Sequence, residues 1–68
     1  MKPQRVVRVL MKLGFEHVRQ KGGHAIFMHH TKRTMVVVPM HSGDIKKGLL
    51  LGIIKQAEVS RQQFIDLL

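Results

Sequence analysis

The sequence predicts an α+β domain with the element order αβββα, in which helices cover one face of a three-stranded antiparallel sheet and a short helix follows at the C-terminal end. Three observations support this fold class. Apolar residues recur at helical spacing near both ends of the chain, β-branched runs occupy its middle, and glycine, proline and polar clusters separate these segments. A chain of 68 residues has room for one domain, so residues 1–68 are expected to form a single unit.

The N-terminal segment has the pattern of an amphipathic helix over residues 2–13. Pro3 suits the first helical turn, and Gly14 stands where a left-handed residue commonly ends a helix. The apolar residues at helical spacing are Val6, Val9, Leu10 and Leu13. Basic residues occupy most of the remaining helix face, which is therefore expected to be exposed to water.

The middle of the chain predicts an antiparallel meander. The expected strands are residues 15–20, 25–29 and 34–38. A Lys-Gly-Gly turn at residues 21–23 separates the first two strands, and a polar loop at residues 30–33 separates the second from the third. Pro39 closes the third strand because proline has no N–H group to donate to a sheet.

Two further helices are predicted after a loop at residues 40–44. The longer helix covers residues 46–57 and is weakened by Gly52, which costs about 1 kcal/mol relative to alanine. Its apolar positions at i, i+3, i+4 and i+7 are Leu50, Ile53, Ile54 and Ala57. Ser60 and Gln63 resemble a capping box that opens a short last helix. The residues expected to dock this helix are Phe64, Leu67 and Leu68.

Charge and element order both favour a nucleic acid as the partner. The chain has 12 Lys and Arg residues against 4 Asp and Glu residues, a formal net charge of +8 with histidine neutral. Such an excess attracts polyanions, and contacts of Lys and Arg with phosphate supply most non-specific affinity for nucleic acids. The element order is, in outline, that of a double-stranded-RNA-binding domain, a class that recognises RNA by shape and backbone. Anionic lipid and simple solubility are the alternative interpretations of the charge.

Other function classes receive little support. The chain has no cysteine, which makes the reducing cytoplasm its natural compartment. Its longest apolar runs, residues 35–40 and 49–54, are far shorter than the roughly 20 residues that span a bilayer. The N-terminus lacks the apolar region of a signal peptide, so no membrane function is expected. The few carboxylates are scattered, which argues against a hydrolase with paired acids. No phosphate-loop motif occurs, and no cofactor is predicted.

His24 is the candidate catalytic residue. It directly follows Gly22 and Gly23, and residues without side chains allow a phosphodiester to approach the imidazole ring. Histidine can accept or donate a proton near neutral pH. The alternative is a strand histidine that is hydrogen-bonded to a neighbour and has no chemical role.

The remaining histidines are assigned to the scaffold more readily than to a metal site. Strand periodicity places His24, Ile26, Met28 and His30 on one side and Ala25, Phe27 and His29 on the other. We expect Phe27 to lie in the core and His29 to be structural or hydrogen-bonded. A metal site built from His29, His30 and His41 is disfavoured, because adjacent strand residues point to opposite faces and no cysteine or well-placed carboxylate completes a zinc set.

An array of short motifs along nearly the whole chain resembles the HicA family of small toxins, also called YcfA-like proteins. The motifs are Leu13-Gly14-Phe15, Gly22-Gly23-His24-x-x-Phe27-x-His29, Val38-Pro39-x-His41, Gly48-Leu49-Leu50 and Lys55-Gln56-Ala57. The resemblance implies a fold like a double-stranded-RNA-binding domain, endoribonuclease activity on messenger RNA within a type II toxin–antitoxin system, and neutralisation by a HicB-like antitoxin. The family's catalytic histidine lies in a Gly-Ser-His motif that matches His24, with Gly23 in place of the serine.

The resemblance and the residue chemistry together predict a metal-free ribonuclease. His24 would act as general acid or base, and Lys21 would stabilise charge that develops on the phosphate. His41 is either a second proton-transfer group, a phosphate ligand or a residue that only shapes its loop.

The remaining RNA-binding candidates are Gly22 and Gly23 at the turn, and Lys32 and Arg33, which either hold backbone phosphate or form a solvated turn. Two other functions remain open. One is an RNA-binding module that does not cut, and the other is an interaction domain for an acidic protein partner. The sequence predicts no oligomeric state.

Overall fold

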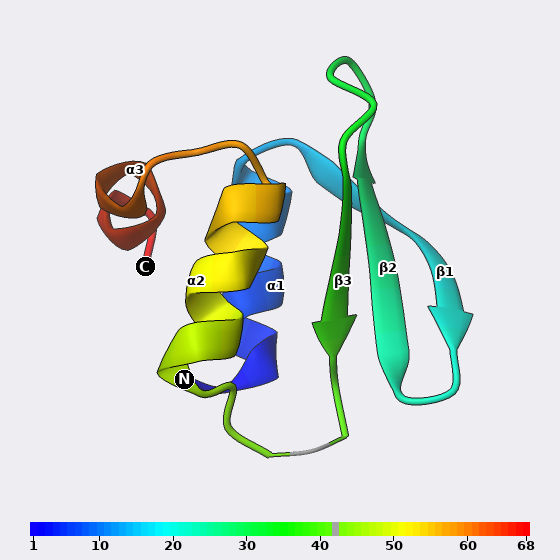
Figure 1. Cartoon of the computed structure of the whole chain (residues 1–68). Coiled ribbons are helices and arrows are strands. Elements are labelled where there is room, and N and C mark those ends of the chain that lie inside the picture. Colours follow the sequence, from blue (N-terminus) through cyan, green and yellow to red (C-terminus); the bar gives the residue numbers. More distant parts are fainter. Residues whose placement is uncertain (42) are drawn as a thin grey trace.

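The computed structural model describes residues 1–41 and 43–68, and Ser42 in the predicted 40–44 loop lies outside them. The elements follow the order α1 (Pro3–Lys12), β1 (Phe15–Lys21), β2 (His24–His29), β3 (Met35–Pro39), α2 (Lys47–Gln56) and α3 (Arg61–Asp66). This confirms the predicted α+β class and element order, and the boundaries of α1, the three strands and α2 lie within one residue of their expected positions (Figure 1).

The three strands form one antiparallel sheet in the order β1-β2-β3. Gly22 and Gly23 make the turn between β1 and β2, and Gly22 adopts a positive φ of 59° that glycine tolerates well. At this end of the sheet Lys21 pairs with His24, and His24 pairs with Pro39 on its other side. The sheet therefore places His24 between the turn and the last residue of β3.

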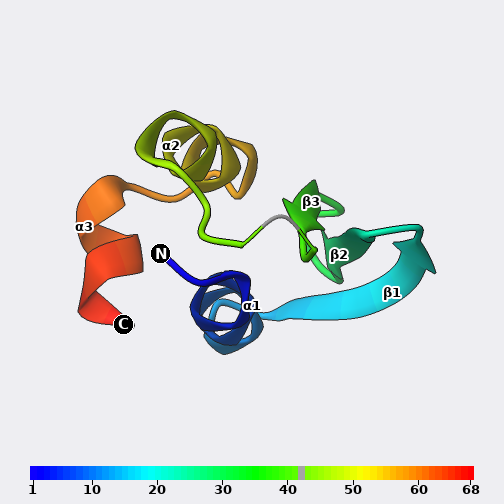
Figure 2. The ribbon, with the colours of Figure 1, turned by 90° about the horizontal axis from the view of Figure 1, so that it is seen from below.

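Helices α1 and α2 lie side by side against the sheet, and α3 lies on their far side (Figure 2). Their apolar faces meet the inward side chains of β2 and β3. The buried core residues include Val6, Leu10, Phe27, Val36, Val38, Ile53 and Phe64. Phe27 is 2% exposed, which confirms its predicted place in the core.

Burial alternates along the two inner strands as the side-chain period of a strand requires. Ala25 and Phe27 are buried in β2, while His24 is exposed and Ile26 only half-buried. In β3, Val37 lies half-buried between two buried valines. β1 is different, because every residue after Phe15 is exposed and many carry charge, which protects an edge strand against pairing with another chain.

Caps at both ends of the chain agree with the sequence signals, but one prediction about the packing of α3 fails. Gly14 ends α1 with a φ of +100°, as predicted for a left-handed cap. Ser60 and Gln63 form a complete capping box at α3, with hydrogen bonds of 2.8 and 3.0 Å. The prediction that Leu68 docks α3 is wrong, because it follows the last turn and is 45% exposed, whereas Phe64 is buried.

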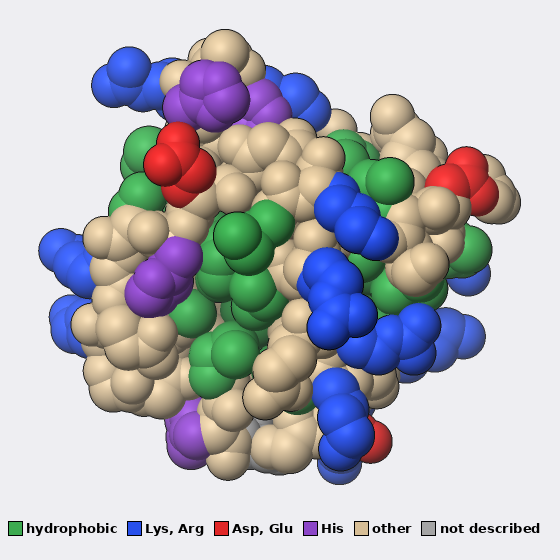
Figure 3. All heavy atoms as spheres, turned by 180° about the vertical axis from the view of Figure 1, so that it is seen from behind, with side chains coloured by type: hydrophobic (Ala, Val, Ile, Leu, Met, Phe, Trp, Pro, Cys, Tyr) green, Lys and Arg blue, Asp and Glu red, His purple; other side chains and the backbone are tan. Residues whose placement is uncertain are grey.

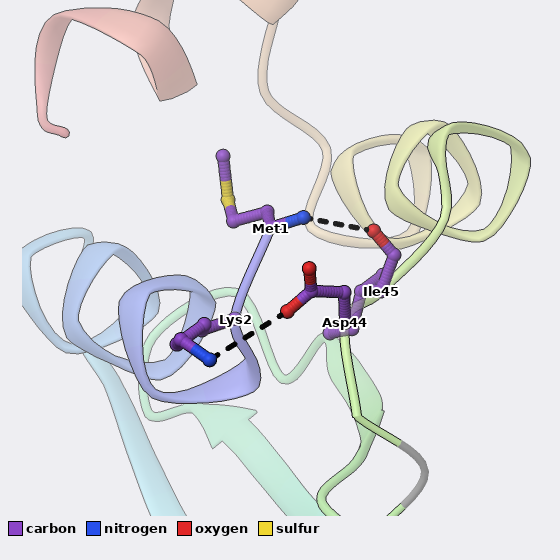
Figure 4. A network of polar contacts seen from close by, with 4 residues as sticks. All are labelled: Met1, Lys2, Asp44 and Ile45. Carbon is purple, nitrogen blue, oxygen red and sulfur yellow. Dashed lines mark hydrogen bonds and ion pairs between the residues drawn. The ribbon is translucent and has the colours of Figure 1, made fainter.

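The loop between β3 and α2 is attached at both ends. The backbone N–H of Met40 donates to the Gly23 carbonyl at 2.7 Å, next to the β1–β2 turn. Further along, the buried Ile45 exchanges backbone hydrogen bonds with Met1, and the exposed side chains of Lys2 and Asp44 approach to 3.9 Å (Figure 4). The hydrogen bond of Met40 places the next residue, His41, beside the first residues of β2.

Candidate functional site: a histidine pair at the β1–β2 turn

His24 begins β2 and presents an exposed imidazole on the sheet face that points away from the core. Its neighbours in the sheet are Lys21 and Pro39. Within residues 1–41 and 43–68, no hydrogen bond engages the ring of His24. The ring is therefore accessible and its nitrogens are not committed to the scaffold by any described partner.

His41 lies against His24. The two ring centroids are 5.8 Å apart and the ring planes meet at 73°. Nδ1 of His41 is 3.3 Å from the carbonyl oxygen of Gly23 and donates to it in the tautomer that carries the proton on Nδ1. This tautomer leaves Nε2 as the proton acceptor, because a neutral imidazole has one donor and one acceptor nitrogen.

Gly23 makes room for the ring of His41. A Cβ atom built on Gly23 would overlap Nδ1 and neighbouring ring atoms of His41. No positive φ requires glycine here, unlike at Gly22, so the need at Gly23 is for space. The histidine ring thus occupies the place that the serine side chain of a Gly-Ser-His motif would take.

An open pocket of about 370 Å³ lies beside His24, between the sheet and α2. Its lining residues are His24, Val37, Pro39, Leu49, Gly52, Ile53 and Gln56. The lining is mainly apolar, and His24 forms one of its walls. A ligand in the pocket would therefore lie next to the histidine pair.

His29, at the other end of β2, belongs to the scaffold as predicted. Its Nε2 lies 3.1 Å from the Leu13 carbonyl oxygen, and Nδ1 accepts from the backbone N–H groups of Thr31 and Lys32 at 3.3 and 3.1 Å. Its ring also meets Phe15 edge to face at a centroid distance of 5.2 Å. Both ring nitrogens are thus committed, Nε2 to the end of α1 and Nδ1 to the β2–β3 turn.

The prediction that His29 and His30 point to opposite faces is wrong. β2 ends at His29, and His30 already belongs to the turn, so strand alternation no longer applies. The two rings are stacked, with a centroid distance of 5.4 Å and an interplanar angle of 1°. His41 is at the opposite end of β2, about five residues or 16 Å of strand away, so these three histidines do not converge.

The predicted cationic residues divide between the two ends of the sheet. Lys21 lies next to His24, whereas Lys32 and Arg33 lie in the β2–β3 turn at the far end, near His29 (Figure 1). Lys46 and Lys47 are exposed at the N-terminus of α2, which lies at the same end of the molecule as the β1–β2 turn. The structure therefore brings Lys21, and not the Lys32–Arg33 pair, to the histidine pair.

A second group of cations lies on the face of the molecule formed by α1. Figure 3 shows a band of Lys and Arg side chains beside an exposed apolar patch on the face formed by α1. The exposed basic residues of this helix are Arg5, Arg8 and Lys12. Among the described residues the ion pair is that of Lys2 with Asp44, so most of the positive charge is uncompensated.

Two further properties concern the described part of the chain alone. In residues 1–41 and 43–68, no three or more His, Asp or Glu side chains gather closely enough to hold a metal ion. None of the helices in those residues has the length and apolar character needed to cross a membrane.

The sequence named His24 and His41 as candidates, but it predicted neither their contact nor the pocket. Both depend on how the β3–α2 loop and α2 pack against the sheet, which no local pattern encodes. One signal was available at Gly52, since a glycine inside a helix that is otherwise well patterned costs stability and often has a functional reason. Lys46 and Lys47 were visible as a basic pair but carried no positional information.

The site and fold define a basic α+β domain with a solvent-exposed histidine pair at a glycine turn. The family model described as the HicA toxin of bacterial toxin–antitoxin systems matches residues 3–59, which extend from the start of α1 to just beyond α2. The chain therefore belongs to the HicA toxin family. Members of this family are known as mRNA interferases, and membership implies an antitoxin partner. No curated protein matches the chain significantly.

Proposed function

We propose that this HicA toxin is an endoribonuclease that cleaves messenger RNA without a metal ion, with His24 as a general acid or base. The observation that carries the proposal is the exposed ring of His24, which faces the ring of His41 across 5.8 Å beside a turn that has no side chains. Two imidazoles at this separation can serve the two sides of one phosphodiester. The membership of the chain in a family of mRNA interferases supports the same assignment.

The reaction that this pair supports needs no nucleophile from the protein. The 2′-hydroxyl of RNA attacks the adjacent phosphorus, one imidazole takes the hydroxyl proton, and the other gives a proton to the departing 5′-oxygen. The bond between phosphorus and the 5′-oxygen breaks, leaving a 2′,3′-cyclic phosphate and a free 5′-hydroxyl. General acid–base assistance of this kind contributes roughly 10²- to 10⁴-fold in rate for each group.

The surroundings of His41 suit it to the second role. Its Nδ1 is directed to the Gly23 carbonyl, and the loop that carries it is attached through Met40 and Ile45. The same hydrogen bond that orients the ring exposes Nε2 as a base in the neutral form. His24 then supplies the complementary proton, and the two exchange roles if the cyclic phosphate is hydrolysed.

RNA binding is assigned to the turn and to nearby cations. Gly22 and Gly23 let the phosphate approach His24, and Lys21 stabilises the charge that develops on it. Lys32 and Arg33, at the far end of the sheet, hold flanking backbone. With a net charge of +8, affinity for RNA should fall steeply as salt is raised.

The partner that restrains the toxin is proposed to be a HicB-like antitoxin that covers the histidine pair and excludes RNA without changing the fold. An acidic surface on that partner would complement the uncompensated positive charge of this chain. A substrate of messenger RNA places both proteins in the cytoplasm. A complex in which His24 remains open to RNA would contradict this mode of inhibition.

A non-catalytic RNA-binding module is the second candidate, because Gly23 replaces the serine of the family motif. The two functions are separated by incubating the protein and a His24→Ala variant with a long RNA in chelator and identifying the product ends. Fragments with 2′,3′-cyclic phosphate and 5′-hydroxyl ends from the wild type alone would support the ribonuclease. Fragments with 5′-phosphate ends, or loss of cleavage in chelator, would refute the mechanism. Intact RNA that is shifted on a native gel by both proteins would favour the binding module.

A further inference from the structure

The pocket beside His24 has a composition unlike a site for phosphate alone. Val37 and Pro39 supply its wall from the sheet, and Leu49 and the buried Ile53 supply its wall from α2. Leu49 is 48% exposed, so an apolar surface remains open to solvent beside the histidine pair. The flat face of an aromatic ring could cover part of this surface, whereas a phosphate group could not.

Gly52 keeps the helix side of the pocket open. It lies in the middle of α2, where glycine is among the poorest helix formers. Its φ is not positive, and a Cβ atom added to it would meet nothing within 4 Å. The fold therefore gives no reason for glycine at this position, whereas a side chain here would extend into the pocket.

Gln56 gives the pocket a polar group one turn of α2 beyond Gly52. Its amide offers both a donor and an acceptor, the combination that reads the edge of a nucleobase. Proteins recognise single-stranded RNA by splaying its bases out, covering the face of the base with a flat side chain such as histidine and hydrogen-bonding its edge.

We propose that this pocket binds the nucleobase of the nucleotide whose phosphate reaches His24, and that Gln56 sets which base is preferred. The inference rests on the proposed ribonuclease function and names its specificity site. RNA is favoured as the occupant because His24 itself forms a wall of the pocket and the exposed Lys46 and Lys47 precede Leu49 by less than one turn. An anionic chain bound along these groups would carry its bases past the pocket.

The test is an equilibrium titration, followed by NMR of the ¹⁵N-labelled protein, with each of the four nucleoside 3′-monophosphates and with inorganic phosphate. We expect at least one nucleotide to bind ten or more times more tightly than phosphate and to shift the amide signals of Val37, Leu49 and Gln56. Gly52→Leu should reduce nucleotide affinity to that of phosphate while leaving phosphate binding unchanged. Gln56→Leu should reduce the differences among the four nucleotides.

Gly48→Leu is the matched control. Gly48 lies one turn earlier in α2, is exposed, and a Cβ atom added there also meets nothing within 4 Å, but it does not line the pocket. This variant should bind nucleotides as the wild type does. Equal losses in Gly48→Leu and Gly52→Leu, or nucleotides that bind no more tightly than phosphate, would overturn the proposal and leave the pocket as a surface for a protein partner.

This titration measures binding and not cleavage, so its failure is distinct from failure of the proposed function. A protein that cleaves RNA but shows no nucleotide preference would retain the ribonuclease and lose the base pocket. Sequencing of cleavage sites adds a second readout, in which the wild type and Gly48→Leu should share a base bias that Gly52→Leu lacks. A bias that survives unchanged in Gly52→Leu would also contradict the proposal.

Discussion

β2 carries a histidine at each end, and the two side chains have opposite surroundings. Both ring nitrogens of His29 are engaged in hydrogen bonds. One lies within hydrogen-bond distance of the Leu13 carbonyl, and the other accepts from N–H groups of the following turn. The ring of His24 is exposed and faces His41 beside a pocket. The difference shows that a residue type alone does not mark a site. A histidine is available for chemistry when its nitrogens are not already committed to holding a turn.

The largest effect is expected from His24→Ala. Cleavage of RNA should slow by roughly 10²- to 10⁴-fold, because a general acid or base is lost from the reaction. The thermal unfolding midpoint should change little, since the removed ring is exposed. Initial rates on an end-labelled RNA and unfolding followed by circular dichroism provide the two readouts. A rate within tenfold of the wild type would remove His24 from the chemistry.

Gly23→Ala should disturb the same end of the strand indirectly. The new methyl group would overlap the ring of His41 and displace it from the Gly23 carbonyl. We expect cleavage to fall by about tenfold or more, approaching the loss in His41→Ala, through loss of one proton-transfer group.

A double-mutant cycle checks the cause of that loss. Adding Gly23→Ala to His41→Ala should have little further effect, because the ring that the methyl group displaces is already gone. Additive losses would show that Gly23 acts through something other than His41. The pH–rate profile should also lose one limb of its bell shape in His41→Ala, which a purely structural role would not produce.

His29→Ala should produce the reverse pattern. Removing the ring leaves the Leu13 carbonyl and the N–H groups of Thr31 and Lys32 without their partner, so the free energy of unfolding should fall by about 1–3 kcal/mol. Cleavage per folded molecule should stay close to that of the wild type. Urea unfolding at equilibrium gives the stability, and assays well below the unfolding midpoint give the rate. Full stability with lost activity would reverse the roles assigned to the two ends.

Local sequence patterns predicted most of the fold, because most of its elements are specified by neighbouring residues. The capping box of Ser60 and Gln63 and the left-handed cap at Gly14 are set by residues within one helical turn, and both were predicted. The core position of Phe27 was predicted because an aromatic residue in a strand is usually buried, and strand alternation then put Ala25 on the same side. The same rule failed at His30, because the strand ends one residue earlier and the turn reorients the ring.

The site was less predictable, because it joins segments that are far apart in the chain. His41 reaches Gly23 across 18 residues of sequence, and only the packing of its loop brings the two together. The pocket also needs α2 beside β3. A motif can therefore nominate His24, while the partner ring and the adjoining pocket appear only when the chain is folded.

The smallest effects are expected from single lysines, which sharpen the comparison between the two ends. Lys21→Ala and Lys32→Ala remove the same charge, but Lys21 pairs with His24 and Lys32 lies beside His29. We expect the cleavage rate at saturating RNA to fall several-fold in Lys21→Ala and to remain nearly unchanged in Lys32→Ala. Both should weaken RNA binding and reduce its salt dependence slightly, since each removes about one phosphate contact. Equal losses of rate would show that proximity to His24 is not what matters.

The central claim is that RNA meets the His24 end of β2 while the His29 end serves the scaffold. It is tested most directly by ¹⁵N NMR of the histidine ring nitrogens during addition of an RNA that cannot be cleaved because its 2′-hydroxyls are methylated. The ring signals of His24 and His41 should move and saturate together, while those of His29 should stay in place. Movement of the His29 signals with no change at His24 would contradict the claim.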